Sequence, residues 1–132
     1  MQFKIGDRAE LSKEITGEDI HNFARVTGDH NPVHLDPDFA AGTRFKSIIA
    51  HGLLSAGLIS AVLGTRLPGP GSIYISQTLQ FIRPVRIGDT ITAEVVITKW
   101  DPEKHILTLD TTCRNQHGKD VLSGEAVLLV EG

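Results

Sequence analysis

The stretch "LLSAGLISAVLG", from Leu53 to Gly64, contains no charged residue and several small ones. It is too short to span a bilayer, which takes roughly 18 apolar residues. The run predicts a buried helix from about His51 to Leu63, ended by "LPGPGS" at residues 67–72. A helix that is apolar on nearly every side is normally covered by other elements, so the fold depends on what covers it.

The covering elements are predicted to be strands. Ile91, Ala93, Val95 and Ile97 alternate with more polar residues, which is the period of a half-buried strand. Short polar segments between the runs can close hairpins, and no helix separates them as in βαβ units. The sequence therefore predicts an α+β fold in which an antiparallel sheet wraps around the central apolar helix. The strand-like runs are "FKIGDRAELSKEI" (3–15), "SIYISQTLQFIRPV" (72–85), "DTITAEVVITKW" (89–100), "HILTLDTTCRN" (105–115) and "DVLSGEAVLLV" (120–130).

The region before the apolar helix is predicted to be short and helical. Thr16 is a suitable N-cap for a first helix, and Gly28 is a suitable C-cap. Residues 36–43, "DPDFAAGT", predict a short helix capped by Asp36. We expect residues 29–35, "DHNPVHL", to form a loop between these helices.

The loop region has an unusual content of ionisable groups. Asp29 and His34 lie five positions apart across a proline turn, so both side chains can face one cleft. A carboxylate beside an imidazole is a general acid/base pair that can hold and activate a water molecule. Asn31 could brace the loop through backbone hydrogen bonds. A purely structural turn and a metal site built from Asp29, His30, His34 and Asp36 are the alternative interpretations; we expect no metal.

The start of the apolar helix offers a second chemical element. A backbone amide at or near Gly52 can stabilise negative charge that develops on an oxygen. Together with an acid/base pair, this favours adding water to, or removing it from, a double bond beside a carbonyl. We expect His51 to bond backbone rather than to act in catalysis.

Composition excludes several functions. The formal net charge is −3 and the 13 Lys and Arg residues are scattered, so nucleic acid is not an expected partner. The single cysteine, Cys113, cannot form an internal disulfide and favours a cytoplasmic location. The first residues lack a signal peptide's apolar core, and no membrane association is expected. A length of 132 residues suits one domain over residues 1–132.

The segment "FARVTGDHNPVHLDPDFA", residues 23–40, resembles the hydratase signature of the MaoC-like dehydratases. These hot-dog-fold proteins include the (R)-specific enoyl-CoA hydratases. Further segments are similar to the short bacterial hydratases linked to polyhydroxyalkanoate synthesis: "IIAHGLLSAGLIS" (48–60), residues 67–98 and "SGEAV" (123–127).

The resemblance implies reversible syn hydration of trans-2-enoyl-CoA to (R)-3-hydroxyacyl-CoA. Asp29 and His34 would be the catalytic pair, Gly52 the oxyanion donor and Ser60 a supporting residue. It implies no cofactor beyond the coenzyme A of the acyl-CoA substrate. It also implies a homodimer with one continuous sheet and an active site near the subunit interface.

Alternative functions remain open at this point. One is dehydration of 3-hydroxyacyl groups on acyl carrier protein or of another hydroxyacyl thioester. A second is a hot-dog thioesterase, although residues 52–64 lack the carboxylate that such an enzyme would use on its central helix. A third is a non-catalytic acyl-CoA-binding module. Our candidates for the acyl-binding residues are Leu53, Leu54, Leu58 and Val62.

Overall fold

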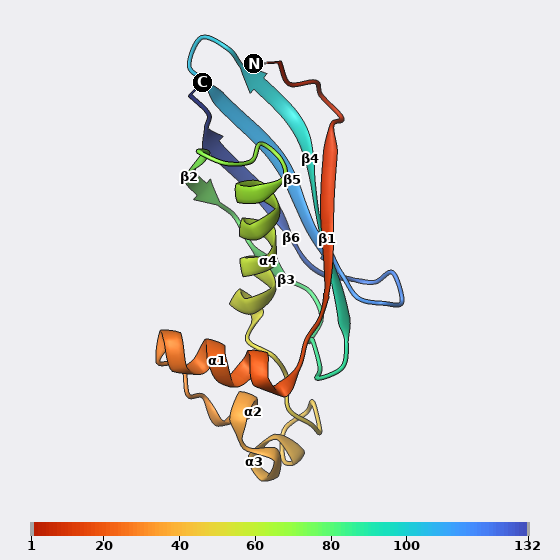
Figure 1. Cartoon of the computed structure of the whole chain (residues 1–132). Coiled ribbons are helices and arrows are strands. Elements are labelled where there is room, and N and C mark those ends of the chain that lie inside the picture. The colour runs from red at the N-terminus through yellow and green to blue at the C-terminus, as the bar shows by residue number, and fades with distance from the viewer. Residues whose placement is uncertain (1, 132) are drawn as a thin grey trace.

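One antiparallel sheet forms most of the molecule and carries the helix α4 on one face (Figure 1). The computed structural model describes residues 2–131. Its elements in chain order are β1 (Arg8–Glu14), α1 (Gly17–Thr27), α2 (Pro32–Leu35), α3 (Pro37–Ala41), α4 (Gly52–Thr65), β2 (Ile73–Gln77), β3 (Gln80–Phe81), β4 (Thr90–Asp101), β5 (Ile106–Arg114) and β6 (Asp120–Leu129).

The strands pair in the order β1-β4-β5-β6-β2, and β3 adds a short pairing to β6. Every pairing between these strands is antiparallel. Ala93 pairs with Cys113 and Ile97 with Leu109, so buried side chains of neighbouring strands share one face. This confirms the predicted alternation in β4. The predicted strand over residues 72–85 is divided into β2 and β3.

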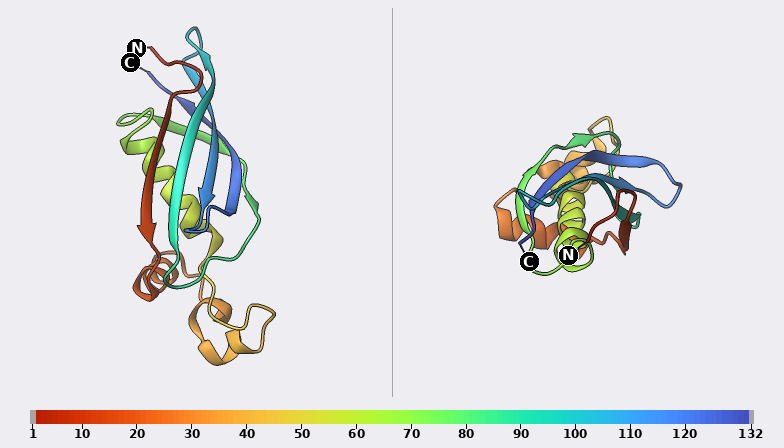
Figure 2. Two further views of the ribbon diagram at one scale, coloured as in Figure 1. Left: turned by 90° about the vertical axis from the view of Figure 1, so that its right-hand side faces the viewer. Right: turned by 90° about the horizontal axis from the view of Figure 1, so that it is seen from above.

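The helix α4 packs its buried side chains against β4 and β5. Ser55, Ile59, Val62 and Leu63 form this buried side. The opposite side is open, and Leu53 is 56% exposed. A single sheet can contact only one face of a helix, as the end-on view illustrates (Figure 2). The predicted apolar helix on an antiparallel sheet is therefore confirmed, and within one chain the sheet covers it on one side.

Helices α1 to α3 gather at the end of the molecule where α4 begins (Figure 1). Thr16 and Asp19 form a reciprocal capping box at the start of α1, and Gly28 ends it at a φ of 81°. The predicted loop over residues 29–35 is wrong in its second half. Residues 32–35 form α2, because the Asn31 side chain caps it and Pro32 fits its first position.

Within residues 2–131, no helix combines the length and the apolar character that crossing a membrane requires.

Candidate active site

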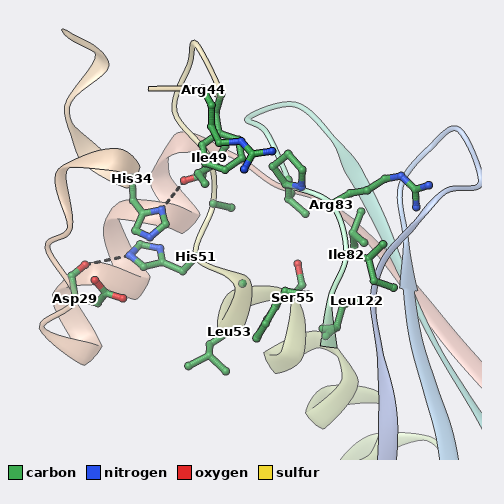
Figure 3. A pocket seen from close by; sticks show the side chains of 17 residues that line it. Asp29, His34, Arg44, Ile49, His51, Leu53, Ser55, Ile82, Arg83 and Leu122 are labelled. Atoms are coloured by element: carbon green, nitrogen blue, oxygen red, sulfur yellow. Dashed lines mark hydrogen bonds between the residues drawn. The ribbon is translucent and has the colours of Figure 1, made fainter. Parts of the chain in front are cut away.

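A cavity of about 480 Å³ lies where α4 begins, between the helical region and the strand β3 (Figure 3). Its size is within the usual range of small-molecule sites. Segments far apart in the sequence form its walls. Its polar and aromatic lining includes Asp29, His34, Arg44, Ser55, Phe81 and Arg83.

His34, on α2, is oriented by a backbone carbonyl. Its Nδ1 lies 2.7 Å from the carbonyl oxygen of Ile49. Because a carbonyl oxygen can only accept, Nδ1 carries the hydrogen, and Nε2 of the neutral ring is free to accept one. This bond links α2 to the segment that leads into α4. It therefore fixes the position of the His34 ring relative to the start of α4.

His51 is a buried residue that contacts both Asp29 and His34. The residue is 2% exposed, and its ring packs against that of His34 with the centroids 3.9 Å apart and the planes tilted by 32°. Its Nε2 donates to the backbone carbonyl of Asp29 over 3.0 Å. Its Nδ1 has no hydrogen-bond partner within residues 2–131. The expectation that His51 bonds backbone is confirmed, although the carbonyl belongs to the distant Asp29 rather than to the helix start.

Asp29 completes a compact polar cluster. One carboxylate oxygen of Asp29 and one ring nitrogen from each of His34 and His51 lie within 4.8 Å of one another. A water molecule that bonds two groups at about 2.8 Å each can span such a gap. The Asp29 carboxylate also accepts a hydrogen bond from the backbone N–H of Asn31 over 3.3 Å. The Asn31 side chain in turn accepts from the N–H of Val33 over 3.2 Å, which braces this turn.

The environment of His51 favours its neutral form. Burial lowers the pKa of His51 below its ordinary value of 6.5, and electrostatic repulsion from His34 and His30 acts in the same direction. The bond to the Asp29 carbonyl and the charge of its carboxylate oppose this shift. A neutral His51 keeps Nε2 protonated as the donor to Asp29.

The lowered pKa of His51 gives a prediction about stability. Below pH 6.5 the unfolded chain takes up a proton at His51 that the folded chain resists, so this contribution is complete above that pH and is lost as pH falls. We expect the melting temperature of the wild type to drop more than that of His51→Gln between about pH 7.5 and about pH 5.5. Glutamine keeps an N–H donor for Asp29 but does not titrate.

Differential scanning calorimetry of both proteins at the two pH values measures this difference. His21→Gln, at an exposed position of α1, is the matched control and should keep the wild-type pH dependence. An identical pH dependence in wild type and His51→Gln would contradict the prediction.

Gly52 is the first residue of α4, so its N–H has no carbonyl partner within the helix. The ring of Phe81 packs directly on this glycine. A Cβ at position 52 would lie 2.5 Å from Cε1 of Phe81, so only glycine allows this contact. The free N–H and the aromatic ring thus lie at the same wall of the cavity.

Of the other candidate residues, the structure places some at the cavity and others away from it. Leu53 lines the cavity beside Gly52. Leu54 and Leu58 pack against the core, and Val62 is fully buried in it. Ser60 is exposed on the open side of α4 and does not line the cavity of one chain.

Sequence reasoning did not find Arg44, Ser55, Phe81 and Arg83, which also line the cavity. They come from three segments, and no local motif connects them. Only the tertiary structure brings these segments together.

Comparison with known proteins places this architecture in a family. The sequence model of one protein family, the MaoC-like domain, matches residues 3–116. The chain belongs to the MaoC-like domain family. An (R)-specific enoyl-CoA hydratase of Rhodospirillum rubrum is 55% identical over 127 residues, which cover 96% of this chain and 88% of the relative. A 3-hydroxybutyryl-CoA dehydratase of Methylorubrum extorquens is 52% identical, with coverage of 96% and 80%.

Solved structures of MaoC-like hydratases agree with the fold. The (R)-hydratase of Aeromonas caviae, which is involved in polyhydroxyalkanoate biosynthesis, superposes with a TM-score of 0.94 at 45% identity. The match covers 98% of both chains. The predicted hot-dog fold is therefore confirmed for this MaoC-like chain.

Proposed function

We propose that this chain is an (R)-specific enoyl-CoA hydratase, which adds water reversibly to trans-2-enoyl-CoA. The observation that carries the proposal is the convergence of Asp29 and His34 in one cavity with the free N-terminus of α4. Relatives with hydratase and dehydratase names at 52–55% identity support it. The product, an (R)-3-hydroxyacyl-CoA, would suit polyester synthesis, the role named for the A. caviae protein.

In the proposed mechanism, Asp29 and His34 are the catalytic pair and bind one water molecule. The carboxylate of Asp29 accepts one hydrogen, and the free Nε2 of His34 bonds the same water. As the water oxygen forms its bond to C3 of the enoyl group, the pair removes one proton and returns one to C2. Because both groups approach the alkene with the same water, the hydroxyl and the proton add to one face. This geometry supports syn addition.

Charge on the substrate develops at the thioester oxygen as C3 is attacked. The Gly52 N–H, at the positive end of the α4 dipole, would donate to this oxygen and stabilise the enolate. Acid/base groups and a polarising amide are sufficient for this reaction, so the proposal includes no cofactor beyond the coenzyme A of the substrate.

The direct experiment is hydration of crotonyl-CoA, followed by the loss of enoyl absorbance. Product chirality, read by chromatography on a chiral phase, should be (R). A parallel measurement of free thiol distinguishes the thioesterase alternative, because hydration leaves the thioester intact. Thiol release without loss of the alkene, or an (S) product, would contradict the proposal.

Two exposed arginines that line the cavity support an anionic thioester carrier. Neither Arg44 nor Arg83 pairs with a carboxylate within residues 2–131. Arg83 donates to the backbone carbonyl of Asp120 over 2.7 Å, and Arg44 lies over the ring of Phe45. Their positive charge is therefore uncompensated and can attract the phosphates of coenzyme A or of a phosphopantetheine arm.

Replacing both Arg44 and Arg83 with glutamine should raise KM for crotonyl-CoA about fivefold and change kcat little. The increase should shrink at high salt, since exposed charges are screened. Steady-state kinetics at two ionic strengths measures both effects. Lys104→Gln, in the hairpin at the opposite end of the sheet, is the control. A KM equal to that of the wild type at low salt would contradict the assignment.

We further propose that the protein is a homodimer. Leu53, Ile73 and Ile75 are each more than half exposed, and an apolar groove separates α4 from β2. The strand β2 is also an edge of the sheet, with its outer backbone groups unpaired by the strands of one chain. A second copy that pairs along this edge would extend the sheet and cover the open side of α4. Ser60, on that side, remains our candidate supporting residue.

A further inference from the structure

Ser55 carries a buried hydroxyl that the fold does not use. Its side chain is on α4 and is 2% exposed. Its Oγ has no hydrogen-bond partner within residues 2–131. A buried polar atom without a partner is costly and rare in folded proteins. Ser55 is one of the residues that line the cavity of the proposed active site, so a ligand bound there can supply the missing partner (Figure 3).

Other helical hydroxyls in this chain make the hydrogen bond that a purely structural Ser55 would be expected to make. Serine and threonine within helices commonly bond the carbonyl four residues earlier. Thr65, on the same helix, does so with the carbonyl of Ala61, and Thr27 of α1 does so with that of Phe23. Ser55 makes no such bond, so its hydrogen remains available to the cavity.

The position of Ser55 on α4 directs its hydroxyl towards Gly52. Residues three apart are neighbours on one helix face. Side chains of a helix lean towards its N-terminus, so the hydroxyl of Ser55 extends over the turn that begins at Gly52. Figure 3 shows the Ser55 oxygen directed into the cavity.

We propose that Ser55 is a catalytic residue whose hydroxyl donates a second hydrogen bond to the thioester oxygen, beside the Gly52 N–H. This inference rests on the proposed hydratase function. As C3 is attacked, negative charge grows on that oxygen, and both donors stabilise it. Ser55 keeps its proton throughout, so the Asp29–His34 pair still performs all proton transfer. When charge develops, two preorganised donors lower the barrier more than one.

The first test is Ser55→Ala, which removes the donor without adding volume. We expect kcat for crotonyl-CoA to fall about 10- to 100-fold, with a smaller change in KM. The melting temperature should not decrease, because alanine removes an unsatisfied polar atom. Thr65→Val on the same helix is the matched control and should keep the wild-type kcat. A normal kcat in Ser55→Ala would overturn the inference, and so would a fall in kcat that accompanies a lower melting temperature.

The second test observes the carbonyl directly and needs no turnover. Butyryl-CoA labelled with carbon-13 at its carbonyl lacks the alkene, so it binds without reacting. Isotope-edited infrared spectra should show the carbonyl stretch at a lower frequency when bound to the wild type than when free. In Ser55→Ala this shift should be smaller. An equal shift in both proteins would overturn the inference.

The two tests separate this inference from the proposed function. A wild type that hydrates crotonyl-CoA while Ser55→Ala is normal by both readouts would contradict only the role of Ser55. A wild type without hydratase activity, but with a carbonyl shift that depends on Ser55, would contradict the proposed function and support the contact.

Discussion

Asp29→Asn should lose hydration of crotonyl-CoA, with kcat reduced about 10³-fold or more. The amide cannot take a proton from water, and its NH₂ group would offer hydrogens where the water needs an acceptor. Substrate binding should change little, since Asp29 lies in the cluster with His34 and His51 rather than beside Arg44 or Arg83 (Figure 3). The loss should therefore appear in kcat, measured from initial rates of enoyl absorbance.

The folded state should tolerate this change. Asp29 is exposed, and asparagine can keep a side-chain oxygen as the acceptor for the backbone N–H of Asn31. Its backbone carbonyl, which holds His51, is unaffected. Asp38→Asn, at an exposed aspartate on the neighbouring α3, is the matched control and should retain wild-type activity. Substantial hydration by a folded Asp29→Asn variant would remove Asp29 from the mechanism.

His34→Asn is expected to have an effect of similar size, about 10³-fold in kcat. The amide nitrogen of asparagine can replace Nδ1 as the donor to the Ile49 carbonyl, so the link between α2 and the start of α4 is kept. What disappears is Nε2, the atom that can exchange a proton with water. The same assay with saturating crotonyl-CoA measures the change.

Two comparisons make the His34 result specific. His30→Asn alters an exposed histidine that does not line the cavity, and it should stay active. The double variant Asp29→Asn/His34→Asn should be no slower than the worse single variant, because residues that act on one water lose their function together. Fully multiplied losses in the double variant would indicate that the two residues act in separate steps.

Several elements could be predicted from residues that are neighbours along the chain. The charge-free run of α4, the alternation in β4 and the caps at Thr16 and Gly28 each depend on local periodicity or on backbone preferences. The proximity of Asp29 and His34 could also be predicted from the sequence, because both residues belong to one proline turn. The short helix α2 was missed because four residues carry too little periodicity to distinguish a helical turn from a loop.

The sequence by itself therefore determined the antiparallel sheet with its apolar helix and most of the helices and strands, and it predicted Asp29 and His34 as the acid/base pair. Only the tertiary structure decided that His51 supports both residues from a distant segment, and that Ser55 faces the cavity while Ser60 does not. The reason is physical: local patterns fix which face of an element is apolar. Which polar side chain stays without a partner depends on packing between segments that lie far apart in the chain.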